Sequence, residues 1–159
     1  MFKGMVFSAR MLLGIFSLLS GLNWFFGFMP LPSIYMPLDT PIKHMVIIEM
    51  IRTGWMFQLA KVIEIALGLS LIFNRGVPLM LVAAFPVMFG TFMLDALILD
   101  DLWGWLQGTV TTDAALYAIG DMIIGGLCVL LLHLWLLWCY LDYYRPMLAW
   151  KATPKEAGE

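Results

Sequence analysis

The chain has 159 residues, of which 62% are hydrophobic and only 13% are charged, and its mean hydropathy is +0.91. A soluble domain of this length is usually about half apolar and roughly a quarter charged, and it still leaves near a third of its unfolded-chain surface exposed. The surplus apolar surface must therefore face lipid. The formal net charge of −2, with Lys and Arg dispersed along the chain, forms no basic patch, so we expect no nucleic-acid partner.

The N-terminal apolar stretch has the flanking charges of a secretory signal, Lys3 and Arg10, but not its end. The apolar run continues to Phe28 and stops at a Pro-rich segment that has no small-residue cleavage pattern. We therefore interpret it as a first membrane span that the protein retains.

Four apolar runs are long enough to cross about 30 Å of hydrocarbon. They cover residues 11–28, 55–73, 77–99 and 114–141. Lipid offers no partner for unpaired backbone groups, and the runs lack the strict alternation of barrel strands, so each should be a helix. The predicted fold is an all-α, integral membrane four-helix bundle, a single membrane domain of residues 1–151 followed by a polar tail of residues 152–159.

The basic residues of the connecting segments predict the orientation. Six of them fall on the side that holds both termini and two on the other: Lys3, Arg10, Arg75, Arg145, Lys151 and Lys155 against Lys43 and Arg52. We therefore expect both termini in the cytoplasm and the protein in the cell inner (plasma) membrane. In the first outer loop, Thr40 and Pro41 can start a short interfacial helix of about residues 41–53, which Gly54 can end.

Four ionisable residues within the spans are the strongest candidates for chemistry, because a charge inside the bilayer costs a few kcal/mol, roughly 3, even on lenient scales. They are Lys61, Glu64, Asp95 and Asp121. All four lie in the outer half of the predicted bundle. One lysine would then face three acids, so at least one carboxyl should stay protonated near neutral pH, and a shared, movable proton is the functional interpretation.

Two helical stripes carry three of these groups, Lys61, Glu64 and Asp121. In the second span, Gln58, Lys61, Glu64 and Gly68 follow three- and four-residue steps, and Tyr117, Asp121, Gly125 and Cys128 do so in the fourth. Asn23 lies near the outer end of the first span. We predict Lys61, Glu64 and Asp121 as catalytic residues, and Asn23, Gln58, Asp95 and Tyr117 as residues that line a cofactor site.

A purely structural interpretation stands beside this one. Lys61 and Glu64 could form an intrahelical pair that only neutralises two charges, and Asp95 and Asp121 could be hydrated near the outer surface. Arg10 could be an ordinary interfacial anchor and His133 an interfacial or packing residue. We predict no metal site and no haem, because the two histidines, His44 and His133, fall on opposite sides of the membrane.

Several segments resemble the DoxX family of small four-helix membrane proteins. The resemblance covers roughly residues 10–99 and is carried by Arg10 to Asn23, by Thr53-Gly54-Trp55, by Lys61-x-x-Glu64-x-x-x-Gly68, and by the hairpin from Phe73 to Leu79 with Pro86 after it. Where many members have a histidine late in the third helix, this chain has Asp95. The resemblance implies a membrane subunit of a quinone-linked redox complex, with quinone as cofactor and other membrane or redox subunits as partners.

Three functions remain open at this stage. The first is such a redox subunit, which would be an oxidoreductase only together with a partner. The second is a non-catalytic scaffold or accessory subunit that stabilises a larger membrane complex through adaptable Met-rich surfaces. The third, a small-solute or proton transporter, is less favoured because no inverted repeat is visible.

Overall fold

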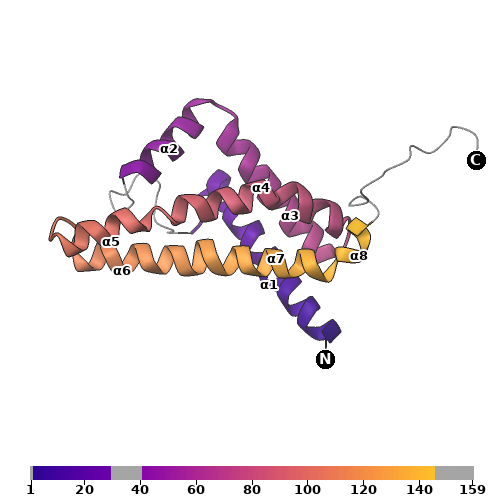
Figure 1. Ribbon diagram of the computed structural model, residues 1–159. Coiled ribbons are helices and arrows are strands. Elements are labelled where there is room, and N and C mark those ends of the chain that lie inside the picture. Colours follow the sequence, from indigo (N-terminus) through magenta and orange to yellow (C-terminus); the bar gives the residue numbers. More distant parts are fainter. Residues whose placement is uncertain (1, 30–40, 146–159) are drawn as a thin grey trace, which may run out of the picture.

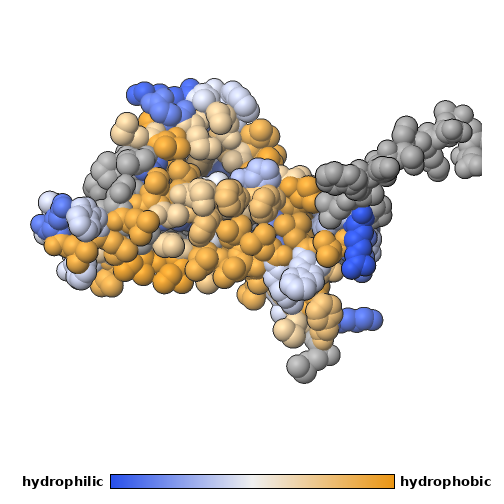
Figure 2. All heavy atoms as spheres, viewed as in Figure 1, coloured by the Kyte–Doolittle hydropathy of each residue, from blue (hydrophilic) through white to orange (hydrophobic). Residues whose placement is uncertain are grey.

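The computed structural model describes residues 2–29 and 41–145. Within this part, four helical segments are long and apolar enough to cross a membrane, which indicates a multi-pass membrane protein. They are α1 (Phe2–Phe26), α3 (Met56–Phe73), α4 (Val77–Asp95) and a stretch covering Ala118–Cys139. Apolar side chains cover most of the visible surface, while hydrophilic ones gather at its extremities (Figure 2). The all-α prediction is confirmed.

Two helix ends lie well away from the ends of the predicted spans. α1 begins at Phe2 rather than at residue 11, because nothing in the basic segment before that residue interrupts a helix. α4 ends at Asp95, before the apolar run does, and a separate helix, α5 (Ile98–Leu106), takes up the remainder. α2 (Pro41–Arg52) lies where the interfacial helix was predicted, and Gly54 follows it with φ 79°.

The last long segment is not uniformly α-helical. It consists of α6 (Thr112–Asp121), a π-helical section η1 (Met122–Cys128) and α7 (Val129–Cys139), followed by the single turn α8 (Leu141–Tyr144). π-Helices are rare and frequently occur at functional sites. The apolar run predicted the length of this segment but not its change of pitch.

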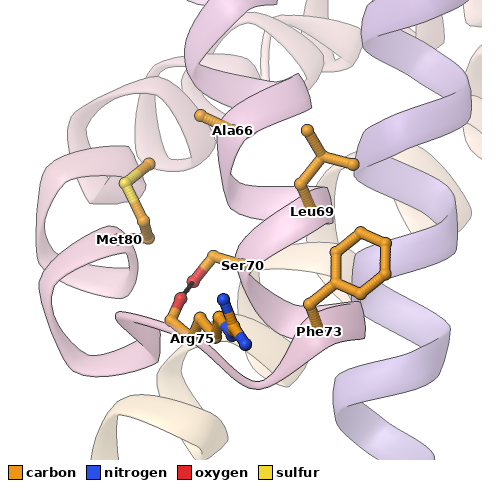
Figure 3. Close-up of a pocket in the computed structure, with 6 residues that line it drawn as sticks. All are labelled: Ala66, Leu69, Ser70, Phe73, Arg75 and Met80. Atoms are coloured by element: carbon orange, nitrogen blue, oxygen red, sulfur yellow. Dashed lines mark hydrogen bonds between the residues drawn. The ribbon is translucent and has the colours of Figure 1, made fainter.

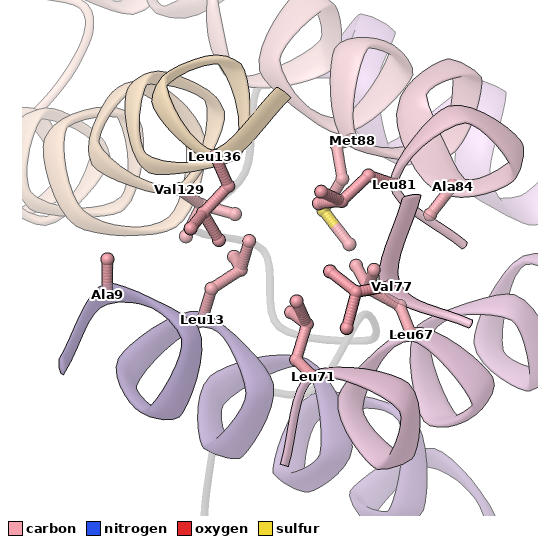
Figure 4. Packing of buried hydrophobic residues seen from close by; sticks show 10 residues of the cluster. All are labelled: Ala9, Leu13, Leu67, Leu71, Val77, Leu81, Ala84, Met88, Val129 and Leu136. Carbon is pink, nitrogen blue, oxygen red and sulfur yellow. The ribbon is translucent and has the colours of Figure 1, made fainter. Parts of the chain in front are cut away.

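The long helices pack in sequence around a common centre. α1 packs most extensively against α3, α3 packs against α4, with which it forms a tight hairpin, and α4 packs in turn against η1 and α7 (Figure 1). Between them lies a hydrophobic core contributed by all four long segments (Figure 4). Its ten buried residues are Ala9, Leu13, Leu67, Leu71, Val77, Leu81, Ala84, Met88, Val129 and Leu136.

Three glycines let α1 and α3 approach each other closely. A Cβ at Gly68 would lie 2.7 Å from Cβ of Leu18 and 2.8 Å from the carbonyl oxygen of Gly14. A Cβ at Gly21 would lie 2.8 Å from the carbonyl oxygen of Lys61. Small residues at a helix contact are typical of membrane proteins, where backbone proximity and dispersion replace the hydrophobic driving force.

One end of the molecule, here called the hairpin end, holds the turn Asn74–Gly76 between α3 and α4. Asn74 (φ 55°) and Gly76 (φ 64°) both adopt the left-handed conformation that a short helical hairpin needs. Arg10 of α1 donates to the carbonyl of Leu71 (3.1 Å) and to the side chain of Asn74 (2.6 Å), so this end also holds the first half of α1. The opposite end, here called the far end, holds α2 and the connection between α5 and α6 (Figure 1).

The short helix α8 is also tied to the hairpin end. The hydroxyl of Tyr144 donates a 2.8 Å hydrogen bond to the carbonyl of Pro78, in the first turn of α4. Burial, with a smaller contribution from Tyr140, raises the pKa of Tyr144, so its phenol keeps the proton that it donates.

His133 joins α7 to α4 inside the core. It is fully buried, and its Nε2 lies 2.9 Å from the carbonyl oxygen of Leu81, shortly before Pro86 within α4. A carbonyl accepts only from a protonated nitrogen, so Nε2 carries hydrogen. This contact agrees with the prediction of a packing role for His133.

Candidate functional site

Lys61, Glu64 and Ser20 form a polar cluster between α1 and α3. The ammonium of Lys61 lies 3.0 and 2.9 Å from the two carboxylate oxygens of Glu64 and donates to Ser20 Oγ at 3.2 Å. The hydroxyl of Ser20 in turn donates to Glu64 Oε2 at 2.9 Å. The cluster is largely shielded, since the side chains of Lys61 and Glu64 are only 17% and 8% exposed.

The local sequence explains this geometry. Lys61 and Glu64 are three residues apart on α3, which places their side chains on one face of the helix. Gly21 brings the α1 backbone against the carbonyl of Lys61, and this close approach positions the neighbouring Ser20 beside the charged pair. The Lys61 ammonium also lies 5.5 Å from the centre of the Phe57 ring, within the range of a cation–π interaction.

Asp95 belongs to a second polar contact. Its Oδ1 lies 2.9 Å from the ammonium of Lys43 on α2, and the two side chains are 5% and 13% exposed. On its other side it packs on η1, where a Cβ at Gly126 would lie 2.8 Å from Asp95 Oδ2. Gly126 therefore makes room for the carboxylate at the π-helical section.

This second contact corrects the expected charge balance. The sequence pattern predicts a single lysine, Lys61, opposite three acids, with Lys43 in the outer loop. Instead, α2 folds onto the far end of the bundle, and its long lysine side chain reaches Asp95. Asp95 thus has a cation of its own, so Lys61 does not have to balance three acids alone. The charge count no longer requires one carboxyl to be protonated.

The other predicted site residues have separate surroundings. Asn23 accepts a 2.7 Å hydrogen bond from the backbone N–H of Met29, where the chain leaves α1. Gln58, one turn before Lys61 on α3, has a buried amide oxygen with no hydrogen-bond partner in the described part of the chain. The backbones of Tyr117 and Asp121 lie in α6, but the placement of their side chains falls outside the described residues.

Two members of these clusters, Ser20 and Lys43, were not among the predicted site residues. Ser20 gives only a weak signal in the sequence, because a serine in an apolar helix is common, although its position before Gly21 places it at the close contact. Lys43 has no local signal, since it pairs with a residue far away in the chain. Nothing in the pattern of α2 alone specifies which helix that lysine meets.

The described residues contain no group of three or more His, Cys, Asp or Glu side chains that could hold a metal ion. In comparisons with known proteins, no family model matched the chain, and neither did any curated sequence or any solved structure.

Proposed function

We propose that the protein is a multi-pass inner-membrane subunit of a quinone-linked redox complex, similar to that implied by its resemblance to the DoxX family. Its termini would lie in the cytoplasm and α2 at the outer surface. The observation that carries the proposal is the shielded cluster of Lys61, Glu64 and Ser20. Buried ionisable groups are expensive in a membrane, and those that persist are usually functional.

The residues around the cluster fit a quinone head group. Its carbonyl oxygens need donors, and a lysine ammonium and a serine hydroxyl are donors; its reduced hydroxyls need acceptors, such as a carboxylate. The unpartnered amide oxygen of Gln58, one turn from Lys61, is a further acceptor. Bound quinone would supply two-electron chemistry coupled to protons.

This chain's residues would orient the quinone head group and provide its hydrogen-bond donors and acceptors. Lys61 and Ser20, which both donate to Glu64 within the cluster, can donate to a quinone oxygen instead, and the carboxylate of Glu64 can accept from a quinol hydroxyl. The electrons would come from a partner subunit that carries a redox group. The chain would therefore act as an oxidoreductase only together with that partner subunit.

The test is to purify the protein in mild detergent, extract bound lipid and quantify quinone. We expect quinone to co-purify with the native chain and to fall at least about tenfold in Lys61→Met, a loss equivalent to about 1.4 kcal/mol. Arg52→Gln is the matched control, because Arg52 and Glu49 form an exposed pair of the same spacing at 2.7 Å. A native chain without quinone, or a folded Lys61→Met that keeps it, would refute the proposal.

A second candidate function, a non-catalytic scaffold, is supported by a different observation. Each oxygen of Glu64 and the hydroxyl of Ser20 already has a partner within the cluster, and the cluster lies on a glycine-mediated helix contact. Such a cluster could serve only to lock α1 to α3. In that case Lys61→Met would lower stability, while partner subunits would still co-purify and the complex would keep its activity.

A further inference from the structure

A groove opens between α3 and α4 at the hairpin end, away from the polar cluster. Its volume is about 740 Å³, within the range of about 300–1,000 Å³ that small-molecule sites occupy. Six residues line it (Figure 3): Ala66, Leu69, Ser70, Phe73, Arg75 and Met80.

The larger part of the groove is apolar and open to the lipid side. Leu69 and Phe73 are 41% and 68% exposed, and they continue the exposed face of α3 that begins with Leu59 and Val62. These four side chains follow helical spacing, so they form one stripe along the helix. In a membrane this stripe meets acyl chains, and the groove is accessible to one of them.

The polar part of the groove is Arg75. Its backbone is held at two points, because its carbonyl accepts a 2.6 Å hydrogen bond from Ser70 Oγ and its N–H donates to the carbonyl of Ser70 at 3.1 Å. Its guanidinium has no hydrogen-bond or ion-pair partner among the described residues. By contrast, Arg10 is engaged by Leu71 and Asn74, as described above, and Arg145 pairs with Asp142 at 3.1 Å.

We propose that this groove binds one anionic phospholipid, with its phosphate at Arg75 and an acyl chain against Leu69, Phe73 and Met80. Charge complementarity favours this occupant, since an arginine whose backbone is held in place, and whose guanidinium has no partner in the described part of the chain, matches an anionic head group on a hydrocarbon chain. The first turn of α4, which begins beside Arg75, adds the partial positive charge of a helix N-terminus. The inference depends only on the membrane setting and is independent of any quinone chemistry.

The experiment uses the full chain, delipidated in mild detergent. Phosphatidylglycerol and phosphatidylcholine with identical acyl chains are added, and bound lipid is counted by native mass spectrometry while the melting temperature is recorded. We expect about fivefold preference for phosphatidylglycerol, the effect of roughly one arginine near an anionic head group, together with a higher melting temperature. Arg75→Gln should abolish the preference, whereas Arg145→Gln, which removes the same charge at the same end, should retain it.

Two further arms separate the possible sources of the phosphate contact. Inorganic phosphate at equal concentration should leave the melting temperature unchanged, because it lacks the chain that fills the apolar part. Ala66→Phe should reduce retention of phosphatidylglycerol by narrowing the groove. Equal stabilisation by inorganic phosphate, or a preference that persists in Arg75→Gln, would overturn the proposal.

Discussion

Lys61–Glu64 and Arg52–Glu49 are ion pairs of the same helical spacing in opposite surroundings. The first is shielded between helices, while the second has side chains that are 72% and 65% exposed. Exposed pairs contribute about 0–1 kcal/mol, whereas removing one partner of a buried pair leaves a charge without compensation. The chain therefore contains its own control for the effect of burial.

We expect Lys61→Met to lower the free energy of unfolding by about 3 kcal/mol, because Glu64 loses its cation inside the protein. Arg52→Gln should change it by less than about 1 kcal/mol. Thermal unfolding in detergent, monitored by circular dichroism, measures the change in stability of both variants. The double variant Lys61→Met with Glu64→Leu should be more stable than Lys61→Met alone, since it removes the unpaired carboxyl; a double variant that is less stable than the single one would contradict this account.

Lys43–Asp95 connects α2 to the end of α4, and its loss should act locally. We expect Lys43→Met to increase amide hydrogen exchange in α2 about tenfold, or about 1.4 kcal/mol of local opening. Exchange in the central turns of α3 should stay unchanged. Mass spectrometry of peptic fragments gives the measurement, with Arg52→Gln as the control on the same helix. Uniformly faster exchange along the whole chain would mean that the contact stabilises the global fold instead.

The two polar contacts differ in how far the sequence could predict them. Lys61 and Glu64 are neighbours on one helix, so their spacing alone predicts the contact. Lys43 and Asp95 lie on different helices, and their contact depends on where α2 packs against the bundle. Ser20 could be placed only after the glycines of α1 were known to touch α3.

At the scale of helices, length and apolarity predict the spans because backbone groups in lipid must be bonded within the segment. Length and apolarity do not distinguish an α-helix from a π-helix, so they do not predict the π-helical section Met122–Cys128. They also say little about where an apolar run breaks. α4 ends at Asp95 within such a run, where the carboxylate contacts Lys43 and packs on Gly126, and α5 starts soon after.

The contact between α1 and α3 should be sensitive to a single methyl group. Gly68→Ala would place its Cβ within 2.8 Å of the Gly14 carbonyl, which is backbone and cannot turn aside. We expect a loss of about 1–3 kcal/mol from overpacking, measured by thermal unfolding in detergent. Gly90→Ala on α4 is the matched control, because nothing lies within 4 Å of its Cβ position. That variant should be neutral or more stable by up to about 1 kcal/mol; equal losses in both would show that helix approach is not what Gly68 provides.

At the scale of the whole molecule, the two shielded ion pairs lie apart from the hydrophobic core. The core residues come from residues 9–13 of α1, 67–71 of α3, 77–88 of α4 and 129–136 of α7. Both shielded ion pairs lie outside these ranges, one in the first half of α3 and the other between α2 and the end of α4. Lys61, Glu64 and Asp95 thus lie toward the far end of the bundle, and the convergence of the polar groups of all four helices in the outer half stays a prediction.

The charges of the connecting segments also predict which end of the bundle faces the cytoplasm. Six basic residues on the terminal side against two on the other predict that the hairpin end is cytoplasmic. In a background with both cysteines replaced by serine, single cysteines would be introduced as Asp142→Cys at the hairpin end, where the side chain is 83% exposed, and as Gln107→Cys at the far end. A membrane-impermeant maleimide applied to intact cells should label Gln107→Cys, whereas Asp142→Cys should react only after permeabilisation. The reverse pattern would place α2 and the shielded ion pairs in the cytoplasmic half, and any quinone exchange at Lys61 would then take its protons from the cytoplasm.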